Sequence, residues 1–326
     1  MTGLSRYWLA AQAAVTVLLL ALLMRRLDLT AMRALFVGLP LSFYLLSLGV
    51  VLAGQVAYAW RWRLLLEAAG AQVPFTHVVR QYFVGIFVNN FLPSTVGGDV
   101  TKIYYLGVRH GYRTVTASVA IDRLLGVGLL ALLAAAALTI SPVTASRLVA
   151  AQIACGGVAV AATLALVVTT MGTGGLPQRV SWLGGRAVRL AGGLQRLRLD
   201  MAAPLRRPAI VAQAAIVVVG YAVAVTAVYV RFIALQTSSP VPSFMAMFAV
   251  VSAATVLSNV PVSLNGLGLR EQLHASLLAP LGISPELAVA ISLLLYAHLV
   301  AASLIGFVLW LRMPARAPLG PSVTSG

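Results

Sequence analysis

Charged residues are scarce in this sequence, and acids are the scarcest among them. Aspartate and glutamate together number seven, against 23 lysines and arginines, and charged residues make up only 9% of the 326 positions. Hydrophobic residues make up 60%. Because soluble domains carry about 25% charged residues, this composition excludes an ordinary soluble protein and indicates an integral membrane protein.

Cysteine and recognisable cofactor motifs are also nearly absent. The single cysteine, Cys155, lies inside an apolar run, so it offers no disulfide and no metal-site spacing, and we interpret it as a small core residue. The four histidines show no spacing such as HExxH, and there is no Walker motif, dinucleotide fingerprint or GxSxG elbow. We therefore expect no metal, no cofactor, and neither ATP-driven nor hydrolytic chemistry.

The excess of basic residues is concentrated in one connector. The formal net charge is +16, and seven of the 23 basic residues fall between Arg179 and Arg207. On a soluble protein this excess would suggest nucleic acid. Beside membrane spans, arginines follow the positive-inside rule and meet anionic headgroups. We therefore expect the connector on the cytoplasmic side of the cell (inner) membrane, and no nucleic-acid partner.

Long apolar runs predict an all-α, multi-pass fold. About 20 helical residues cross ~30 Å of hydrocarbon, and the full spans are expected near residues 8–24, 38–59, 115–139, 147–170, 209–232 and 287–311. The first run lacks a small-residue cleavage site, so we interpret it as a retained helix. Residues 77–110 and 243–280 each contain two short apolar pieces interrupted by Pro, Gly and Asn. Such backbone must be buried or face a watery cavity, which predicts two re-entrant or broken-helix hairpins.

The two interruptions resemble each other. The first reads NNFLPSTVGGD and the second SNVPVSLNGLGLRE, and in both a proline precedes a glycine by five positions. Paired interruptions are typical of transporters built from repeats. With a cytoplasmic connector, the first hairpin enters from the cytoplasm and the second from outside, as an inverted repeat requires. The scheme places Arg25, Arg26 and Arg33 outside; if both pieces of the first hairpin crossed, that anomaly would disappear and the symmetry would weaken.

These features predict a single transmembrane domain over residues 1–312, with repeats over 1–140 and 147–312, a basic connector over 171–208 and a disordered tail over 313–326. Apolar residues in the connector share one helical face flanked by arginines, which favours an amphipathic helix on the membrane surface. They are Leu183, Ala187, Leu190, Leu194 and Leu197. Glycine pairs in the same segment leave an irregular loop open as the alternative.

Three carboxylates fall inside the apolar framework, each near a basic residue. The pairs are Asp99 with Lys102, Asp122 with Arg123, and Glu271 with Arg270. A charge at the bilayer centre costs about 2.5–3.5 kcal/mol on insertion scales, so such residues usually pair, face a cavity or take part in transport. Salt bridges that only lock the hairpins remain open as the structural alternative.

The glycines beside these pairs favour an anion site. Gly97 and Gly98 would allow backbone N–H groups to approach a ligand. A helix starting at about Asp99 would direct its free N–H groups and positive dipole at an anion. Lys102 would supply a cation, and Arg270 a planar fork suited to phosphate. Asp99 would repel phosphate, so we expect it to hold a basic side chain or the amine of a zwitterionic headgroup.

Four tyrosines in or near the broken segments and the last span are interpreted as anchors at the membrane interface rather than as ligands. They are Tyr82, Tyr104, Tyr105 and Tyr296.

Three motifs together resemble a known family. They are NNFLPSTVGGDVTKIYYL from Asn89, ASVAIDRLLG over residues 117–126, and NVPVSLNGLGLRE ending at Glu271. In this order they resemble the lysylphosphatidylglycerol synthase transmembrane region, also called the flippase-like family. The resemblance implies a polytopic domain that binds or translocates lipids. In full-length synthases a soluble aminoacyl-transferase domain follows it, whereas this chain ends at Gly326, so we expect no enzyme that makes lysyl-lipid.

We therefore expect a lipid flippase or lipid-binding protein, not an enzyme, that handles an anionic phospholipid or a lipid-linked sugar. The alternatives are a scaffold for a membrane glycosyltransferase or lipid-modifying enzyme and, with less support, an integral-membrane transferase. The expected headgroup-binding residues are Asn90, Pro93, Gly97, Gly98, Asp99, Lys102, Asp122, Arg123, Asn265, Gly266, Arg270 and Glu271. In this hypothesis Lys102 and Arg270 bind phosphate, Asp99 and Glu271 orient them or take a proton, and Asp122 pairs with Arg123 or a base across the bundle.

Overall fold

The computed structural model describes residues 14–23, 25, 27–91, 97–140, 145–171, 185–237, 240–260 and 262–313. These residues form helices joined by short turns, with no strand among them, which confirms the all-α prediction. Some sequence-based expectations lie wholly or partly outside the described residues. They are Pro93, the start of the first predicted span, Arg26, residues 172–184 of the basic connector including Leu183, and the tail from residue 314 onwards.

Five helices in the described part of the chain are long and apolar enough to cross a membrane. They are α3 (Leu41–Ala68), α6 (Tyr112–Ile140), α7 (Ser146–Thr170), α10 (Pro208–Gln236) and α13 (Pro285–Leu311). They match five of the six predicted spans. The remaining prediction, over 8–24, is described only as the short apolar helix Ala14–Leu23. The chain is therefore an integral membrane protein, and α3 continues well past its predicted end near residue 59.

The helix starts follow local capping chemistry. Asp28 precedes the short helix α2 (Leu29–Val37), and its Oδ1 accepts the N–H groups of Thr30 at 2.8 Å and Ala31 at 3.1 Å. At the start of α13, the Ser284 hydroxyl accepts the Leu287 N–H at 3.3 Å, and proline occupies the first helical position. Both arrangements satisfy N–H groups that a helix start otherwise leaves unpaired.

The first predicted hairpin consists of α4 (Phe75–Phe91) and α5 (Gly97–His110). The two helices contain 17 and 14 residues. At a rise of about 1.5 Å per residue, each helix is shorter than the ~30 Å thickness of the hydrocarbon core. The two helices pack closely because glycines face each other. A Cβ atom added at Gly98 would lie 2.2 Å from the carbonyl oxygen of Gly85. Small residues at such contacts let membrane helices approach backbone to backbone.

The second predicted hairpin consists of α11 (Phe244–Leu257) and α12 (Leu269–Leu278), with the short 3₁₀ turn η2 (Leu264–Gly266) between them. A second turn, η3 (Ala279–Leu281), leads towards α13. Ten of the 14 residues of α11 are buried, as expected for a helix that is apolar on every side. Neither α11 nor α12 is among the helices long enough to span.

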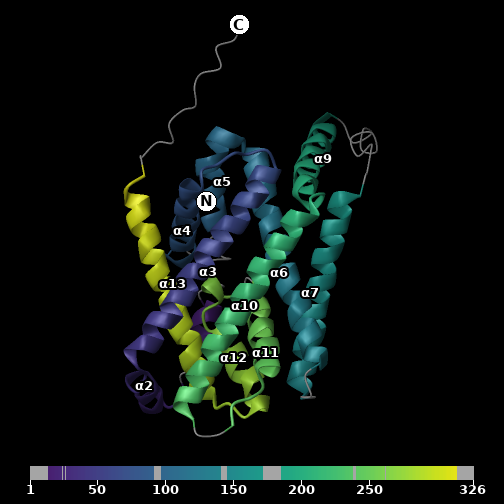
Figure 1. The fold of residues 1–326 in the computed structure, drawn as a ribbon. Helices are drawn as coiled ribbons and strands as arrows, with labels where there is room; N and C mark the ends of the chain where they lie inside the picture. Colours follow the sequence, from purple (N-terminus) through teal and green to yellow (C-terminus); the bar gives the residue numbers. More distant parts are fainter. Residues whose placement is uncertain are drawn as a thin grey trace.

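The hairpins occupy opposite halves of the molecule. Figure 1 shows α4 and α5 in the half that also holds α9, whereas α11 and α12 lie in the half that holds α2. The chain therefore enters the first hairpin from one end of the bundle and the second hairpin from the other. This arrangement fits the predicted inverted repeat, which itself stays a prediction.

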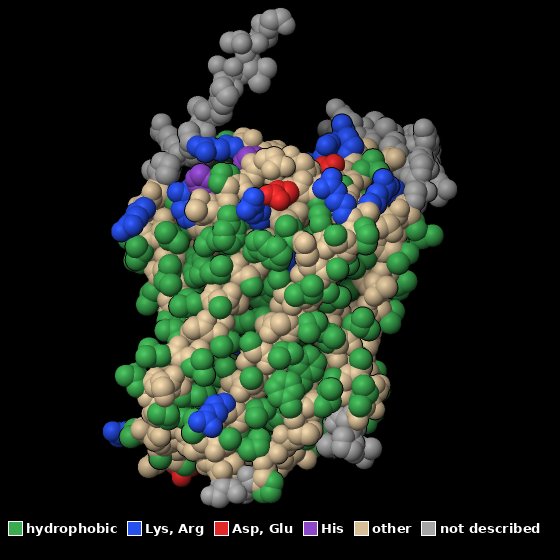
Figure 2. Space-filling view, viewed as in Figure 1, with side chains coloured by type: hydrophobic (Ala, Val, Ile, Leu, Met, Phe, Trp, Pro, Cys, Tyr) green, Lys and Arg blue, Asp and Glu red, His purple; other side chains and the backbone are tan. Residues whose placement is uncertain are grey.

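The charge on the surface agrees with a membrane orientation. A broad band of hydrophobic side chains separates two ends, and blue basic side chains gather mainly at the end of α5 and α9 (Figure 2). The positive-inside rule predicts that this end faces the cytoplasm, and the orientation itself stays a prediction. Arg33 lies on α2 at the other end, so the anomaly noted in the sequence persists in the fold.

Part of the basic connector is a helix, α9 (Gly185–Leu205), which favours the helical interpretation over an irregular loop. It packs against α6 and α7 at the end of the bundle that also holds α5. The Arg113 Nε atom lies 2.6 Å from Asp200 Oδ2, which joins the start of α6 to α9. Leu194 is 62% exposed, so part of the apolar face remains available to the membrane surface.

Candidate functional site

A polar cavity lies at the middle of the bundle. Its volume is about 430 Å³. Gln55, Gly126, Tyr221 and Leu299 line it, and they stand close to the midpoints of α3, α6, α10 and α13. Side chains from α4, α5, α11 and the segment before α12 complete the wall. A cavity at this depth with many polar side chains in its wall is unusual, because buried polar groups in a membrane need partners.

The tips of the two broken segments meet at this cavity. The Nδ2 group of Asn265 donates a hydrogen bond to Oδ1 of Asn90, which joins the second interruption to the end of α4. Asn265 has φ +49°, and Gly266 and Gly268 have φ +75° and +78°. Such values favour glycine and, among other residues, asparagine. The sequence NGLG therefore folds as a sharp reversal that brings Asn265 and Gly266 to the cavity wall.

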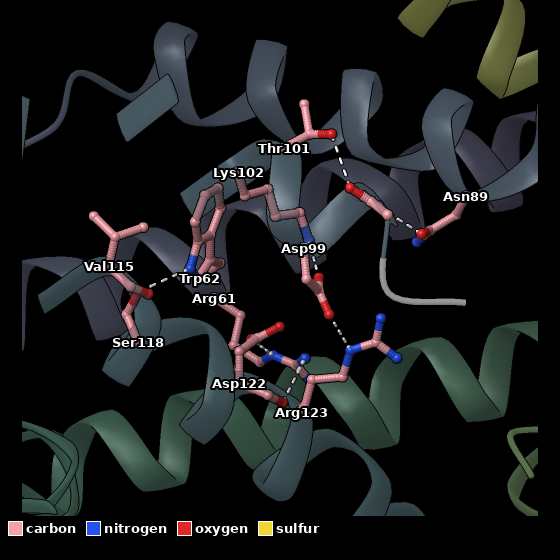
Figure 3. Close-up of polar contacts among 12 residues, drawn as sticks. Arg61, Trp62, Asn89, Asp99, Thr101, Lys102, Val115, Ser118, Asp122 and Arg123 are labelled. Carbon is pink, nitrogen blue, oxygen red and sulfur yellow. Dashed lines mark hydrogen bonds and ion pairs between the residues drawn. The ribbon is translucent and has the colours of Figure 1, made fainter. Parts of the chain in front are cut away.

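Asp99 is the centre of a three-residue ionic cluster. Its Oδ2 lies 2.6 Å from Arg123 Nε and its Oδ1 lies 3.4 Å from Lys102 Nζ, as Figure 3 shows. The side chain of Asp99 is 10% exposed, whereas that of Arg123 is 45% exposed. The expectation that Asp99 holds Lys102 or an arginine is met by both at once. Arg123 is the more exposed of the two basic side chains in this cluster, since the side chain of Lys102 is 11% exposed.

Lys102 also lies against two aromatic rings. Its Nζ is 4.2 Å from the centre of the Tyr82 ring and 5.2 Å from that of Trp62. Ring faces attract a cation, which lowers the cost of burying the ammonium. Tyr82 lines the cavity, so the interpretation of this tyrosine as an interfacial anchor is corrected. The two ring faces therefore help to stabilise the buried ammonium of Lys102, whose ion-pair partner Asp99 lies at the long distance of 3.4 Å.

Asp122 pairs across the bundle with Arg61 of α3. Arg61 Nε lies 2.8 Å from Asp122 Oδ1, and its Nη2 donates to the Asp122 carbonyl at 3.3 Å. The guanidinium lies 4.8 Å from the Tyr58 ring centre. A Cβ at Gly126 would approach its Nη2 to 3.0 Å. Arg61 is thus clamped between an aromatic ring and a glycine of α6.

Arg270 and Glu271 form the third cluster, at the start of α12. Arg270 Nε and Nη2 donate to Glu271 Oε1 at 3.1 and 2.8 Å. The other carboxylate oxygen accepts the Gly268 N–H at 2.7 Å. Arg270 lines the cavity and lies 4.5 Å from the Tyr296 ring centre, whereas Glu271 is fully buried behind it. Tyr296 therefore contacts a charged group rather than serving only as an interfacial anchor.

The glycine pair has a different role from the one expected. The described helix begins at Gly97, two residues before the expected start at about Asp99, and the Gly98 N–H donates to Asn89 Oδ1 at 2.7 Å. Because that donor is occupied and Gly98 faces Gly85, the residue packs α5 onto α4. The Gly97 carbonyl accepts the Thr101 hydroxyl at 2.8 Å. Neither glycine lines the cavity.

Most of the expected residues do converge on the cavity. Those that line it are Asn90, Asp99, Lys102, Asp122, Arg123, Asn265, Gly266 and Arg270. Gly97, Gly98 and Glu271 do not line it, and Pro93 is outside the described residues. Sequence reasoning missed several polar lining residues on helices that seemed to be ordinary spans or hairpin flanks. They are Gln55, Tyr58, Arg61, Asn89, Tyr221 and Asn259.

The charges around the cavity favour an anion. Four basic side chains line it, from Arg61, Lys102, Arg123 and Arg270, against the two carboxylates of Asp99 and Asp122. Even with Glu271 counted behind the wall, one cation remains in excess. A low-dielectric site with surplus cations attracts a negatively charged group. Within the described residues, no group of three His, Cys, Asp or Glu is placed to hold a metal ion.

The sequence is similar to one known protein family and to a membrane protein of an archaeon. Residues 9–312 match the model of the family described as the lysylphosphatidylglycerol synthase TM region. The chain is also 32% identical over 91 residues to the UPF0104 membrane protein PH1989 of Pyrococcus horikoshii. That alignment covers 27% of this chain and 27% of the relative's length. The family match spans both hairpins and every cavity-lining residue.

Proposed function

Because this chain belongs to the family of the lysylphosphatidylglycerol synthase transmembrane region, we propose that it binds the anionic headgroup of a membrane lipid in the central cavity and moves that lipid between leaflets. The acyl chains remain in the bilayer while the headgroup occupies the polar interior. The surplus of basic side chains at mid-membrane depth is the observation that carries the proposal. A phosphate crossing hydrocarbon alone would lose all its hydrogen bonds, and this cavity supplies replacements.

Hydrogen-bond donors in the wall support the same ligand. Arg61 Nη1 and Asn90 Nδ2 are buried and have no hydrogen-bond partner among the described residues. Buried donors are nearly always paired in proteins, so two such groups around one cavity favour an acceptor-rich guest. A phosphate group carries acceptor oxygens on every side and matches both the charge and the donors.

The two hairpins support movement as well as binding. They enter from opposite ends of the bundle and meet through Asn90 and Asn265 at the cavity. Broken segments that meet at the midplane are typical of alternating-access transporters. Parting the first hairpin would open the cavity towards the cytoplasmic end, and parting the second would open it towards the other end.

The ion pairs give specific support to a second candidate, a scaffold that docks a glycosyltransferase or lipid-modifying enzyme. Every carboxylate of the three clusters already has a basic partner. Such networks can serve to fix the geometry of a fold alone. In that case the basic surface near α9 would be the docking face, and the cavity would hold no lipid.

Native mass spectrometry of the gently solubilised protein separates the two candidates. Arg123→Gln is the most informative change because Arg123 is the exposed member of its cluster and Asp99 keeps Lys102 as a partner. Losing a charged hydrogen bond costs about 1.5–3 kcal/mol, roughly a tenfold or larger loss of affinity. Arg113→Gln, at the exposed pair with Asp200, is the matched control.

The headgroup proposal requires a defined anionic lipid on the wild type and on Arg113→Gln, and its loss from a well-folded Arg123→Gln. Reconstitution of the same proteins with a fluorescent anionic lipid would then measure movement between leaflets. If Arg123→Gln retains the same generic lipids as wild type, the scaffold function is favoured instead.

A further inference from the structure

Exposure is uneven around the wall of the cavity. Of the described residues that line it, four are exposed, and the others are buried or half-buried. The four are Arg123, Thr255, Asn259 and Val260. The Arg123 side chain is 45% exposed and Val260 is 46% exposed, whereas the Lys102 side chain deeper in the cluster is 11% exposed. The described wall is therefore open at one place and closed around the rest.

The four exposed residues come from two neighbouring helices. Arg123 lies on α6 and Thr255 on α11, and Asn259 and Val260 belong to the turn that follows α11. α6 packs against α11. Because the two helices are in contact and all four residues line the same cavity, they form the rim of one opening, which we call the side portal.

The side portal lies at mid-membrane depth. Residue 126 is the middle of α6 (Tyr112–Ile140), and Arg123 precedes it by three positions. α11 has 14 residues, which span about 21 Å, so it ends before it has crossed ~30 Å of hydrocarbon. The end of α11 and Arg123 are therefore at similar depth. Acyl chains, not water, surround the bundle there.

The end of α11 is built to remain exposed at this depth. The Ser258 hydroxyl and the Asn259 Nδ2 group both donate to the Thr255 carbonyl, at 2.9 and 2.8 Å. A helix end leaves carbonyl groups without partners, and hydrocarbon supplies no water to replace them. Side chains of the rim itself therefore provide the hydrogen bonds that an aqueous helix end would take from solvent.

The rim is polar towards the cavity and apolar away from it. Arg123 and Asn259 supply its polar part. Val260 lines the cavity and is 46% exposed, and Val262, which is 41% exposed, does not line it. A phospholipid has the same division, with an anionic phosphate beside apolar acyl chains. A cation exposed at mid-membrane depth is costly, and a phosphate beside Arg123 would offset that cost.

We propose that a lipid occupies the side portal with its phosphate headgroup inside the cavity and its acyl chains outside. The glycerol backbone spans the rim, Arg123 is the first cation that the phosphate meets, and the acyl chains lie against Val260 and Val262. The inference rests on the proposed function, since it requires a headgroup in the cavity. It adds the route: the lipid enters sideways between α6 and the end of α11, not from an aqueous end of the bundle.

Spin labels test whether the rim faces hydrocarbon. Val260→Cys carries the label in a Cys155→Ser background, and Val160→Cys is the control. Val160 is 60% exposed near the middle of α7 and does not line the cavity. In reconstituted bilayers, oxygen concentrates in the hydrocarbon and a nickel chelate stays in water. The label at Val260 should be relaxed mainly by oxygen, like the control. Relaxation mainly by the nickel chelate would mean a water-filled mouth and would overturn the side portal.

A bulky substitution tests whether the lipid passes there. Val260→Trp adds a ring to the rim, and Val160→Trp adds the same ring to the outer face of α7. Vesicles would contain phosphatidylglycerol with a fluorescent group on one acyl chain. Overpacking costs energies that correspond to about a tenfold change in a rate or equilibrium constant. Val260→Trp should therefore slow movement between leaflets by about tenfold or more, and Val160→Trp should keep the wild-type rate.

The outcomes separate this inference from the function on which it rests. A wild type that neither binds nor moves an anionic lipid contradicts the proposed function itself. A wild type that moves the lipid, with a folded Val260→Trp that moves it equally fast, leaves the proposed function intact and overturns the side portal. If Val260→Trp does not fold, the oxygen and nickel measurement on Val260→Cys decides the question, because it requires no transport.

Discussion

Replacing Asp122 by alanine tests how much the buried pair with Arg61 stabilises the fold. The two side chains are 12% and 6% exposed, and Arg61 Nε lies 2.8 Å from Asp122 Oδ1. Asp122→Ala leaves the guanidinium enclosed by Tyr58 and α6, with the Asp122 main-chain carbonyl still accepting from Nη2. The variant therefore creates an uncompensated buried cation while it removes little volume.

The expected magnitude follows from that burial. Breaking a buried pair by removing one partner costs about 3–5 kcal/mol, whereas removing both partners together is often close to neutral. We therefore expect Asp122→Ala to lower the free energy of unfolding by about 3–5 kcal/mol and Arg61→Leu with Asp122→Ala to restore most of it. The exposed pair of Arg113 and Asp200 is the control, for which alanine should cost about 0.2–1 kcal/mol.

Reversible unfolding in mixed micelles with a denaturing detergent would give these free energies as a double-mutant cycle. A cost for Asp122→Ala as small as that of the exposed control would refute the argument that burial makes this pair stabilising. A double variant as unstable as the single one would refute the claim that the stranded charge is the cause. Either result would point to a role for Asp122 in ligand binding rather than in the fold.

Three further outcomes are expected. Gly98→Ala should lower the free energy of unfolding by about 1–3 kcal/mol, or prevent folding, because its Cβ would meet the Gly85 carbonyl. Gly156→Ala is the control: a Cβ there has nothing within 4 Å, so this variant should behave as wild type in the same unfolding assay. Asn265→Ala should reduce stability and lipid transport more than Asn265→Gly, because both lose the contact with Asn90 but only alanine strains the φ +49° backbone. In a Cys155→Ser background, an impermeant thiol reagent added outside cells should label Val37→Cys and not Gly193→Cys, and the reverse pattern would invert the assigned orientation.

The sequence predicted the architecture well because the signals were local. Long apolar runs identified five spans, and Pro, Gly and Asn inside apolar segments identified both hairpins. The predicted end of the second span, near residue 59, was wrong for a physical reason. Arg61 interrupts its apolar pattern as a span end would, yet the charge is buried against Asp122 and the helix continues to Ala68. In the sequence alone, an arginine after an apolar run is equally consistent with a buried ion pair and with the end of a membrane span.

Contacts within the site were predictable only where they join neighbours along one helix. Asp99 with Lys102 follows from a spacing of three residues on a helix, and this pair is present. Arg270 and Glu271 are adjacent in the sequence, and their pair is also present. The partner of Asp122 was not predictable, because Arg61 reaches it from a helix 61 positions earlier. Pairing across a bundle depends on helix packing, which spacing in one segment does not encode.

The role of Gly98 also required the fold. A glycine pair before a helix is equally consistent with an anion-binding helix start and with close packing of two helices. The deciding fact is the position of Gly85, which leaves no room for a Cβ at Gly98. The hydrogen bond from its N–H to Asn89 then occupies one of the donors on which the anion hypothesis relied.

Photo-crosslinking tests the central claim most directly, because it reports where the lipid headgroup lies. An anionic phospholipid with a photoreactive group on its headgroup would be reconstituted with the protein, irradiated, and located by peptide mapping. The account predicts labelled peptides from the cavity wall around Asp99, Asp122 and Arg270, and their loss in a folded Arg123→Gln variant. Labelling confined to the outer hydrophobic band and the basic end, and unchanged in the variant, would contradict it.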